Sequence, residues 1–424
     1  LMIRRPPRST HCISSAASDV YKRQVVIEAN EQWSQFRGHY GNGIIKSTSA
    51  PINWSENTNI DWKTPIHDRG WSSPVIWNDQ IWMTTATKDG NKMYAICVNK
   101  LSGKIEHDIH VFDVKSPQAI TNENTYASPT PVVEEGRVYV HFGTYGTACI
   151  STKDGQILWK RRDLNCDHEI GAGPASSPFI YNNFLIFNVD GRDVQYVIAL
   201  NKETGETAWK TNRSVDFSDV QVNQRKAYGT PFIIPRGNTN QMVSIGAKGV
   251  YSYDPENGKE LWKAEHRGWS IAPRPVYGEG LVFTMIDRDR PEMWAINPNG
   301  SGDITETHIQ WKETKRMPPR ASPIIIKGLL FVVDRNGYIS CIEAKTGKSI
   351  WQKRMKGRFS ASPILANNLI YFFNEDTVCT IIKPTRELEI VAENKLSGDK
   401  LMATPASVSY THLRAHETRH ELVC

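Results

Sequence analysis

Two short histidine-containing stretches are the first places in this sequence where side chains could do chemistry. His168 is followed by Glu169, and His107 and Asp108 lie close to His110. Either stretch could supply metal ligands or a general acid and base. Histidines in turns and edge strands are more often structural, and the chain has no P-loop, no convincing GxSxG elbow and no zinc-type CxxC pair. The sequence therefore predicts no catalytic residue and no metal ligand.

A second set of reactive side chains recurs at the starts of short apolar strands and in the turns that follow the next strand. If such strands are antiparallel neighbours, these two places lie on one face of the fold. The candidate ligand residues are Trp71, Tyr126, His168, Tyr228, Trp269, Arg320 and Phe359 at strand starts, and Asp190, Asp287 and Asp334 in turns. Two interpretations stay open. The rings are packing residues and the charged tips are solvated turns, or the set lines a funnel for a small polar or aromatic ligand, or for a peptide.

The elements that would position these residues are built from a repeated phrase. Val197–Thr211 alternates like two short strands joined by a tight turn, and it ends on Trp209. Gly205 can adopt the positive φ that such a turn requires. The same spacing from glycine to tryptophan occurs at Gly155 and Trp159, Gly205 and Trp209, Gly258 and Trp262, and Gly347 and Trp351.

A second phrase, a small residue before a proline, precedes an apolar strand at intervals of 40 to 55 residues. Its prolines are Pro74, Pro129, Pro178, Pro231, Pro275, Pro323, Pro363 and Pro405. Units of about 40–50 residues with four short strands each are typical of β-propeller blades. The sequence therefore predicts an all-β fold, an eight-bladed β-propeller with four-stranded antiparallel blades.

The chain divides into four predicted parts, with the propeller over residues 59–407 and a turn-rich lead-in over residues 25–58. Asn59–Pro65 matches the end of a repeat but has no blade before it, so we expect it to complete the last blade and close the ring. The strand after Leu401 starts that eighth blade, whose second and third strands are expected to be missing, leaving an incomplete closing blade. Residues 1–24 and 408–424 show neither strand alternation nor a repeat phrase. Both resemble translated sequencing adaptor, so we expect non-native tails and exclude them from fold reasoning.

Composition argues against several classes of partner. The 424 residues are 39% hydrophobic and contain no apolar run near the ~18 residues that a membrane span needs. The formal net charge is +6, but residues 1–24 contribute four of these charges, so the basic balance does not indicate nucleic-acid or membrane binding. Cys97, Cys149 and Cys341 each lie six residues before a turn glycine, and Cys379 lies six before Thr385. We therefore expect small buried apolar residues there, and no metal site or disulfide.

The phrase Ala199-x-Asn201-x-x-Thr204-Gly205-x-x-x-Trp209 resembles the tryptophan-docking motif of propellers related to pyrroloquinoline-quinone (PQQ) dehydrogenases. The opening segments QFRG, GNGI, INWSENTNIDWKT and GWSSP are similar to a subgroup of secreted bacterial PQQ-like repeat proteins. The resemblance covers residues of about 30 to 407. It implies that each tryptophan packs between blades onto the turn glycine of its neighbour. It extends equally to the non-enzymatic scaffold propeller of bacterial outer-membrane protein assembly, which binds partner proteins.

This resemblance implies a function but does not select a site. The favoured hypothesis is a non-catalytic, monomeric propeller in the periplasm or outside the cell. It would bind protein partners or a small polar ligand, with no cofactor and no nucleic acid. The alternative is a PQQ- and calcium-dependent alcohol or sugar dehydrogenase, or a module of a larger enzyme. The chain lacks the vicinal cysteine pair that many of those enzymes carry over the quinone, and no Glu/Asn/Asp calcium set is legible. A signal peptide would precede residue 25 and is expected to be missing from this fragment. Export is therefore inferred from the family resemblance.

Overall fold

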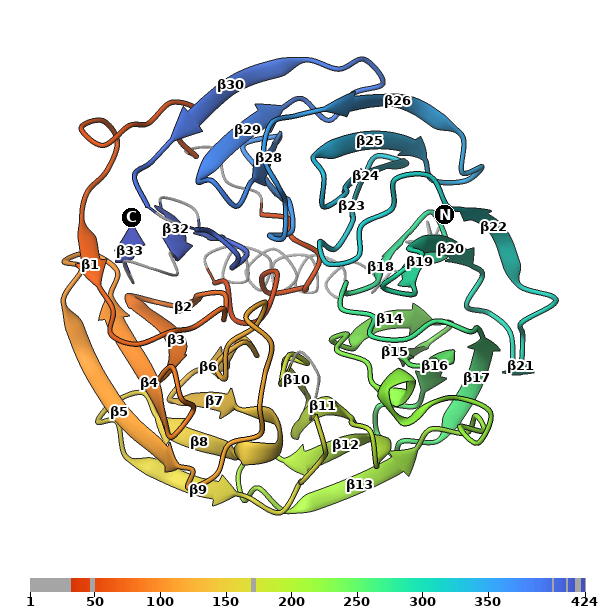
Figure 1. The fold of residues 1–424 in the computed structure, drawn as a ribbon, viewed down its shortest axis with the longest axis horizontal. Helices are drawn as coiled ribbons and strands as arrows, with labels where there is room; N and C mark the ends of the chain where they lie inside the picture. The colour runs from red at the N-terminus through yellow and green to blue at the C-terminus, as the bar shows by residue number, and fades with distance from the viewer. Residues whose placement is uncertain are drawn as a thin grey trace, which may run out of the picture.

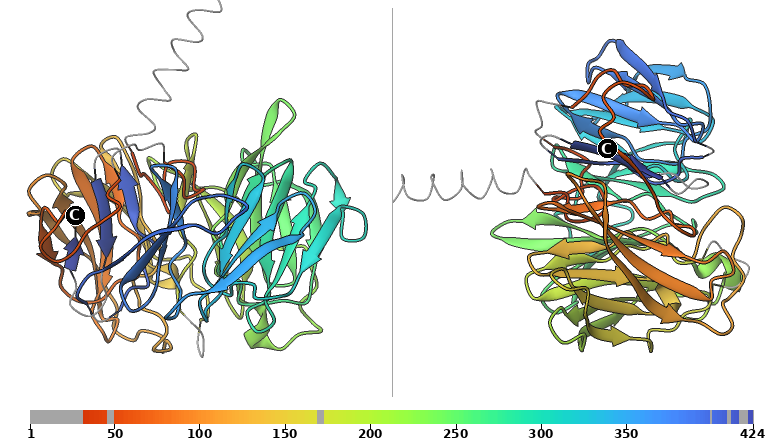
Figure 2. Two further views of the ribbon diagram at one scale, coloured as in Figure 1. Left: turned by 90° about the horizontal axis from the view of Figure 1, so that it is seen from above. Right: turned by 90° about the vertical axis from the view of Figure 1, so that its left-hand side faces the viewer.

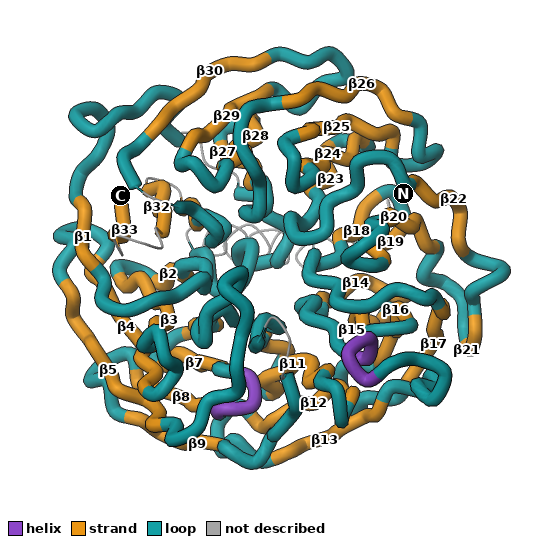
Figure 3. Tube along the Cα trace, viewed as in Figure 1, coloured by secondary structure: helices purple, strands orange, loops and turns teal. Residues whose placement is uncertain are grey.

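The strands form antiparallel sheets that radiate from one axis like the blades of a propeller (Figure 1). This computed structural model describes residues 32–45, 50–168, 173–398, 400–408, 411–415 and 421–423. Within these ranges the helices are the short 3₁₀ turns η1 (Gly143–Tyr145) and η2 (Val222–Arg225), and none is long and apolar enough for a membrane crossing. Figure 2 shows the sheets standing upright in the ring, and Figure 3 shows strands alternating with loops around it. The predicted all-β propeller is confirmed.

Seven of the sheets have four strands and one has five, and in Figure 1 each sheet runs from the axis outwards. Sheet 1 contains β2 (Val75–Trp77), β3 (Gln80–Ala86), β4 (Lys92–Asn99) and β5 (Ile105–Asp113). Sheet 2 contains β6 (Val132–Glu134), β7 (Arg137–His141), β8 (Thr147–Ser151) and β9 (Ile157–Arg161). Sheet 3 contains β10 (Phe179–Tyr181), β11 (Phe184–Asp190), β12 (Gln195–Asn201) and β13 (Thr207–Asn212). Sheet 4 contains β14 (Phe232–Arg236), β15 (Thr239–Gly246), β16 (Gly249–Tyr253), β17 (Glu260–Glu265) and the added strand β21 (Gly302–Asp303).

The second half of the ring follows the same plan. Sheet 5 contains β18 (Val276–Gly278), β19 (Leu281–Ile286), β20 (Glu292–Ile296) and β22 (Ile309–Glu313). Sheet 6 contains β23 (Ile324–Ile326), β24 (Leu329–Val333), β25 (Tyr338–Glu343) and β26 (Ser349–Arg354). Sheet 7 contains β27 (Ile364–Ala366), β28 (Leu369–Phe373), β29 (Val378–Ile382) and β30 (Ile390–Lys395). Sheet 8 contains β31 (Ala406–Val408), β32 (Thr411–Ala415), β33 (Glu421–Val423) and β1 (Lys63–Pro65).

Burial along the strands follows their distance from the axis. All five residues of β24, Leu-Leu-Phe-Val-Val, are buried, as expected for a strand covered on both faces by neighbouring sheets. The outer strand β9, Ile-Leu-Trp-Lys-Arg, alternates between half-buried and exposed residues. The core is thus a ring of apolar clusters between adjacent sheets, one of which joins sheets 4, 5 and 6.

A bulge recurs between the third and fourth strands of sheets 1 to 7 and places a small residue opposite the aromatic residue of the fourth strand in sheets 1 to 6. Cys149 pairs with Trp159, and Ala199 pairs with Trp209. The side chains of Cys97, Cys149, Cys341 and Cys379 are buried, as the sequence predicted. In sheets 1, 2 and 6 the small residue opposite the aromatic side chain of the fourth strand is therefore a cysteine.

Indole rings of the fourth strands rest on the turn of the next sheet. Nε1–H of Trp159 donates to the Lys202 carbonyl at 3.0 Å, and the ring lies 2.7 Å from the point where a Cβ would stand on Gly205. Equivalent indole-to-carbonyl bonds join Trp62 to Lys100, Trp209 to Pro255, Trp311 to Ala344 and Trp351 to Thr385. The rings of Trp62, Trp209 and Trp311 lie on Gly103, Gly258 and Gly347, and Gly155 lies under His107, which occupies the tryptophan position of sheet 1.

Trp262 departs from this pattern. Its Nε1–H donates to Oε1 of Gln241 in its own sheet at 2.8 Å, and Nε2–H of Gln241 donates to the Pro298 carbonyl of the next sheet at 3.2 Å. An insertion in sheet 5 lays β21 parallel to β17 and pairs Gly302 with Trp262, which leaves the ring fully buried. Trp262 is therefore linked to a carbonyl of the next sheet through Gln241, whereas the other indoles donate to such a carbonyl directly.

Replacing Gly205 by alanine should lower the free energy of unfolding by about 2–3 kcal/mol. Gly205 has φ +76°, where an L side chain is strained, and the new Cβ would meet the Trp159 ring at 2.7 Å. Gly136→Ala is the matched control, because Gly136 has φ +77° with nothing within 4 Å of the Cβ position. We expect a loss of about 1 kcal/mol there. Denaturant unfolding measures both variants, and equal losses would show that the indole contact adds nothing.

Sheet 8 brings together strands from distant parts of the sequence, β1 near the start and β31 to β33 near the end. Lys63 of β1 pairs antiparallel with Val423 of β33, and β32 connects β33 to β31. The expectation that this sheet lacks its second and third strands is corrected by β32 and β33. Antiparallel pairing uses backbone groups and needs no repeat phrase. The non-native origin of residues 408–424 stays a prediction, and residues 1–24 lie outside the described residues.

Candidate functional site

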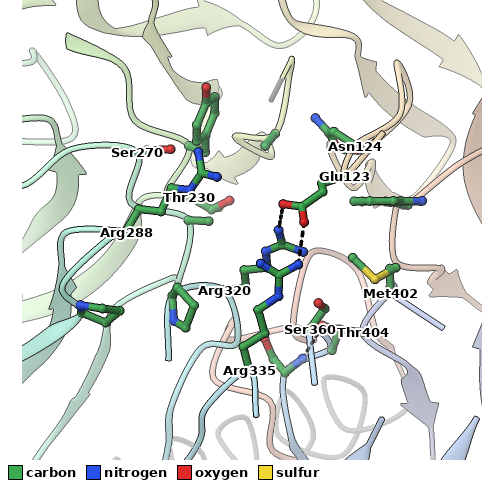
Figure 4. A pocket seen from close by; sticks show the side chains of 18 of the residues that line it. Glu123, Asn124, Thr230, Ser270, Arg288, Arg320, Arg335, Ser360, Met402 and Thr404 are labelled. Carbon is green, nitrogen blue, oxygen red and sulfur yellow. Dashed lines mark hydrogen bonds and ion pairs between the residues drawn. The ribbon is translucent and has the colours of Figure 1, made fainter. Parts of the chain in front are cut away.

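A cavity of about 650 Å³ lies at the centre of the ring and is lined by residues of the loops next to the innermost strands of the sheets (Figure 4). Its wall combines hydroxyl groups, aromatic rings and guanidinium groups. The hydroxyl residues are Ser73, Thr121, Ser128, Thr130, Ser177, Thr230, Ser270, Thr314, Ser360, Ser362 and Thr404, the rings include Trp71 and Tyr228, and the arginines are Arg288, Arg316, Arg320 and Arg335.

Many of these hydroxyls occupy the position before the proline that opens a sheet, and we call them the hydroxyl belt. A residue before proline is held extended, so its N–H points to the side and can reach the next sheet. Thr130 N–H donates to Ser177 Oγ at 2.9 Å, and Ser177 N–H donates to Thr230 Oγ1 at 3.1 Å. The same bond runs from Ser73 to Thr130, from Ser322 to Ser362 and from Ser362 to Thr404. In sheet 2 the belt residue precedes Pro131, so the sequence placed that repeat proline two residues too early, at Pro129.

Arg274 interrupts the hydroxyl belt at sheet 5. Its own N–H continues the belt by donating to Ser322 Oγ at 2.9 Å. Its guanidinium group instead donates to the Pro231 carbonyl of sheet 4 at 2.9 Å and to the Phe36 carbonyl at 2.7 Å. This arginine therefore ties the N-terminal lead-in to the centre of the ring.

The lead-in forms the floor of the cavity. Residues 32–45 cross the centre of the ring (Figure 1), and Phe36 is one of the residues that line the cavity. Backbone hydrogen bonds hold both ends of this segment, with Trp33 bonded to Ile76 of sheet 1 and Ile45 to Leu365 of sheet 7. The cavity is thus lined at its inner end by the chain itself.

Two buried guanidinium groups hold this floor in place. Nη1 of Arg37 donates to the Pro323 carbonyl at 2.7 Å, and both Arg37 and Arg274 are buried. Burial lowers the pKa of each to about 9, so both stay charged at neutral pH. Within the described part of the chain neither forms an ion pair with a carboxylate. Their hydrogen bonds go chiefly to backbone carbonyls, so the floor carries positive charge.

Higher in the cavity, Glu123 reaches across to two arginines of sheet 6 (Figure 4). Oε1 accepts from Arg335 Nη2 at 2.5 Å, and Oε2 accepts from Arg320 Nη2. The hydrogen bond from Arg335, helped by the charge of Arg320, lowers the pKa of Glu123 to about 2. The Glu123 carboxylate is therefore ionised at neutral pH and forms a bridge between distant sheets.

The loop that carries Glu123, between β5 and β6, is anchored on the opposite side of the ring. The Gln118 N–H donates to the Tyr145 hydroxyl at 3.1 Å, and Gln118 Nε2 donates to the Cys166 carbonyl at 3.2 Å. Asn124 donates to the Pro174 carbonyl at 3.2 Å. These bonds fix the loop to sheet 2 and to the segment before sheet 3, and the Glu123 carboxylate is what joins it to sheet 6.

The ten candidate ligand residues are distributed over three places. Trp71, Tyr228, Arg320 and Asp334 line the cavity; Tyr126, Trp269, Phe359 and Asp287 lie outside its lining; His168 and Asp190 line a second, smaller cavity, where Tyr228 also lies. Tyr126 and Phe359 are buried in apolar clusters between sheets, and Asp287 accepts the N–H of Asp289 in its own turn. Tyr126 and Phe359 thus pack between sheets and Asp287 bonds within its own turn, while a ligand role for the ten residues stays a prediction.

The second cavity measures about 20 Å³ and is buried in sheets 2 and 3. Cys166 Sγ lies 3.0 Å from Nε2 of His168. Burial raises the pKa of the Cys166 thiol and lowers the pKa of His168 to about 4, so at neutral pH this is a thiol beside a neutral imidazole. No group of three or more His, Cys, Asp or Glu residues could hold a metal ion among the residues that the structure describes.

Glu123, Asn124 and Arg274 are among the site residues that the ten sequence candidates do not include. Glu123 and Asn124 lie in a long connection without a repeat phrase, and such connections are often functional. Arg274 stands where the proline phrase otherwise has serine or threonine. An arginine at a position otherwise held by serine or threonine could have been recognised in the sequence as a candidate functional residue.

Comparison with known proteins identifies the family. The family described as outer membrane protein assembly factor BamB matches residues 79–231, 193–325 and 247–386. BamB of Alkalilimnicola ehrlichii is 22% identical over 208 residues, which cover 48% of this chain and 49% of that protein. Quinohemoprotein alcohol dehydrogenase ADH-IIG of Pseudomonas putida is 24% identical over 178 residues, covering 36% of this chain and 23% of the enzyme. The matched part thus spans about half of that BamB and about a quarter of that dehydrogenase.

Solved structures show the same fold. A europium-containing methanol dehydrogenase matches with a TM-score of 0.67 at 10% identity, covering 95% of this chain and 91% of that chain. Identity this low shows the fold alone. The family match covers more than half of the sequence, and the chain therefore belongs to the BamB family of PQQ-like repeat propellers.

Proposed function

We propose that this chain is a non-catalytic scaffold propeller that works in the periplasm or outside the cell. Its axial cavity binds a peptide segment of a protein partner or a small polar ligand. In this proposal the ring is eight-bladed, closed by β1, and acts as a monomer.

The observation that carries the proposal is the cavity with its floor. A volume of about 650 Å³ lies in the range of protein ligand sites, and its lining mixes apolar rings with hydroxyl and guanidinium donors. The lead-in lies across the inner end, held by Arg37 and Arg274. Such a pocket offers hydrogen bonds and charge to an inserted group, but its described carboxylates are already engaged or exposed, which leaves no poised general base.

The relatives support binding and export without deciding the activity. BamB proteins are named for outer membrane protein assembly, and the alcohol dehydrogenase relatives are named as quinoproteins. Scaffold function is favoured because the residues present do not fit the calcium of a PQQ centre. Calcium takes six to eight oxygen ligands. Glu123 is bound by two guanidinium groups, and Asp334 accepts the N–H groups of Asn336 and Tyr338.

The dehydrogenase alternative is tested directly by loading the purified chain with PQQ and Ca²⁺ and offering alcohols or sugars with a dye acceptor. We expect no dye reduction above that of PQQ and Ca²⁺ alone. A PQQ dehydrogenase assayed in parallel controls for competent reagents. Turnover by the chain would overturn the proposal.

Binding is tested with a library of displayed peptides selected on the purified chain. A photo-crosslinking residue at position 71, in the cavity wall, should capture the selected peptides. The same residue at position 158, exposed on the outer strand β9, should not. Capture at both positions, or enrichment of no peptide, would contradict a role for the cavity in binding.

A further inference from the structure

The contact between Glu123 and the two arginines of sheet 6 resembles a bound ligand more than a structural clamp. The loop between β5 and β6 is fixed by its own bonds to sheet 2 and to the segment before sheet 3. Only the Glu123 carboxylate contacts Arg320 and Arg335 among the contacts described for this loop. A carboxylate from another molecule could therefore take the same place without unfolding the loop.

The arginine pair has donor capacity beyond what Glu123 uses. Nε of Arg335 is buried and has no hydrogen-bond partner among the described residues. Arg288 and Arg316 also line the cavity, so its lining contains four arginines against the three carboxylate residues Glu123, Asp289 and Asp334. Planar guanidinium forks match carboxylates in two-point geometry. The wall around sheet 6 is thus built for an anion with a planar oxygen pair.

The internal contact is also weak enough to exchange. The side chains of Arg320, Arg335 and Glu123 are 22%, 29% and 43% exposed, so water in the cavity screens their attraction. Ion pairs of this kind contribute little because they lose side-chain entropy and face competing solvent. When a ligand carboxylate binds, its ion pairs with Arg320 and Arg335 replace those of Glu123. Any further contacts of the ligand with the cavity wall then favour binding.

We propose that Arg320 and Arg335 form a carboxylate-binding site that Glu123 occupies as an internal ligand until a peptide carboxylate displaces it. The incoming group is an acidic side chain or a C-terminal carboxylate of the bound peptide. The Trp71 ring lines the same cavity and offers apolar surface to a residue beside that carboxylate. This inference rests on the proposed binding function and names the chemical class of its ligand.

The test is a ligand-observed NMR titration of the full chain with short capped peptides. The acidic probe is acetyl-Gly-Phe-Glu-amide, and acetyl-Gly-Phe-Gly with a free C-terminus presents the terminal carboxylate. Acetyl-Gly-Phe-Gln-amide is the neutral control, and glutarate is the free dicarboxylate. The side-chain and terminal arms identify the source of the carboxylate, and glutarate shows whether peptide contacts are needed.

Five variants separate displacement from general charge effects. Glu123→Gln should bind the acidic probe about twofold to fivefold more tightly, because the competing carboxylate is gone. Arg335→Gln should bind it at least roughly tenfold more weakly. Glu203→Gln and Arg137→Gln remove the partners of an ion pair on the outer side of the ring and should leave affinity unchanged. Asp289→Asn removes one negative charge from the cavity wall without touching the pair, so a smaller gain than that of Glu123→Gln is expected.

The outcomes are decisive in both directions. Tighter binding by Glu123→Gln, with loss in Arg335→Gln and no response to the neutral probe, supports the site. If Glu123→Gln and Asp289→Asn gain the same affinity for the acidic probe, the gain comes from net charge alone. That result would overturn the proposal that the probe displaces the Glu123 carboxylate. Absence of acidic-probe binding to both the parent chain and Glu123→Gln would overturn the inference, while neutral peptides captured at position 71 would leave the binding function intact.

Discussion

Lowering the pH from 7 to 5 should reduce the free energy of unfolding by about 6 kcal/mol. His141, His168 and His266 are buried, and burial lowers their pKa values to about 3, 4 and 3. In the unfolded chain each has a pKa of about 6.5. Between these values the unfolded state binds protons that the folded state rejects, so stability falls as the pH falls. Each histidine contributes about 2 kcal/mol at pH 5, a large share of a typical domain's stability.

Urea unfolding of the parent chain across this pH range measures the effect, and histidine variants assign it. His141→Gln and His266→Gln should each flatten the pH dependence by about 2 kcal/mol, whatever they do to stability at pH 7. His67→Gln is the opposite control. Burial lowers the pKa of His67, but hydrogen bonds to Asp108 and Asp68 outweigh it and raise the pKa. Removing His67 should not reduce the loss of unfolding free energy between pH 7 and pH 5. If the free energy of unfolding falls with pH equally in all variants, the assignment of the effect to His141 and His266 is wrong.

Asp190→Asn should destabilise the folded chain by about 3–5 kcal/mol. The Asp190 and Arg213 side chains are 1% and 0% exposed, and the guanidinium group donates to the carboxylate at 2.8 and 3.1 Å. Burial raises the pKa of Asp190, but the two-point contact with Arg213 favours the carboxylate. The variant leaves the arginine charge buried beside the Tyr251 ring without a counter-ion.

The double variant Asp190→Leu/Arg213→Met distinguishes a needed ion pair from a tolerated one. Replacing both partners by apolar groups removes both desolvation penalties, so we expect stability within about 2 kcal/mol of the parent chain. Denaturant midpoints of the single and double variants give the coupling. A double variant as unstable as Asp190→Asn would show that the network with the Tyr253 hydroxyl contributes more than charge balance.

The repeat phrases carried most of the information about the fold. Glycine and tryptophan at fixed spacing predicted the turn and the ring that rests on it, because a positive φ and a large flat side chain are local requirements. Trp262 keeps the phrase but not the contact, since an insertion in the next sheet is a tertiary event that the local sequence does not encode. The strands β32 and β33 likewise pair through backbone groups that no side-chain pattern announces.

The cavity was predicted less completely than the ring. Arg320 and Asp334 lie at repeat positions, so their face could be inferred from strand order. Glu123 lies in a loop outside the repeat, and its position depends on Gln118, whose partners come from two other segments. Phe359 occupies a repeat position but turns into the core, because burial of an aromatic ring outweighs its placement at a strand start.

The lead-in across the axis has a consequence for how a polypeptide could use this protein. The lead-in, residues 32–45, lies across the axis of the ring. An extended polypeptide therefore cannot pass through the centre from one face to the other. If a partner binds in the cavity as proposed, only a chain end, a bend or a single side chain of that partner can enter it. Under that proposal, binding and release take place through the same opening, and the partner is held at one point along its chain.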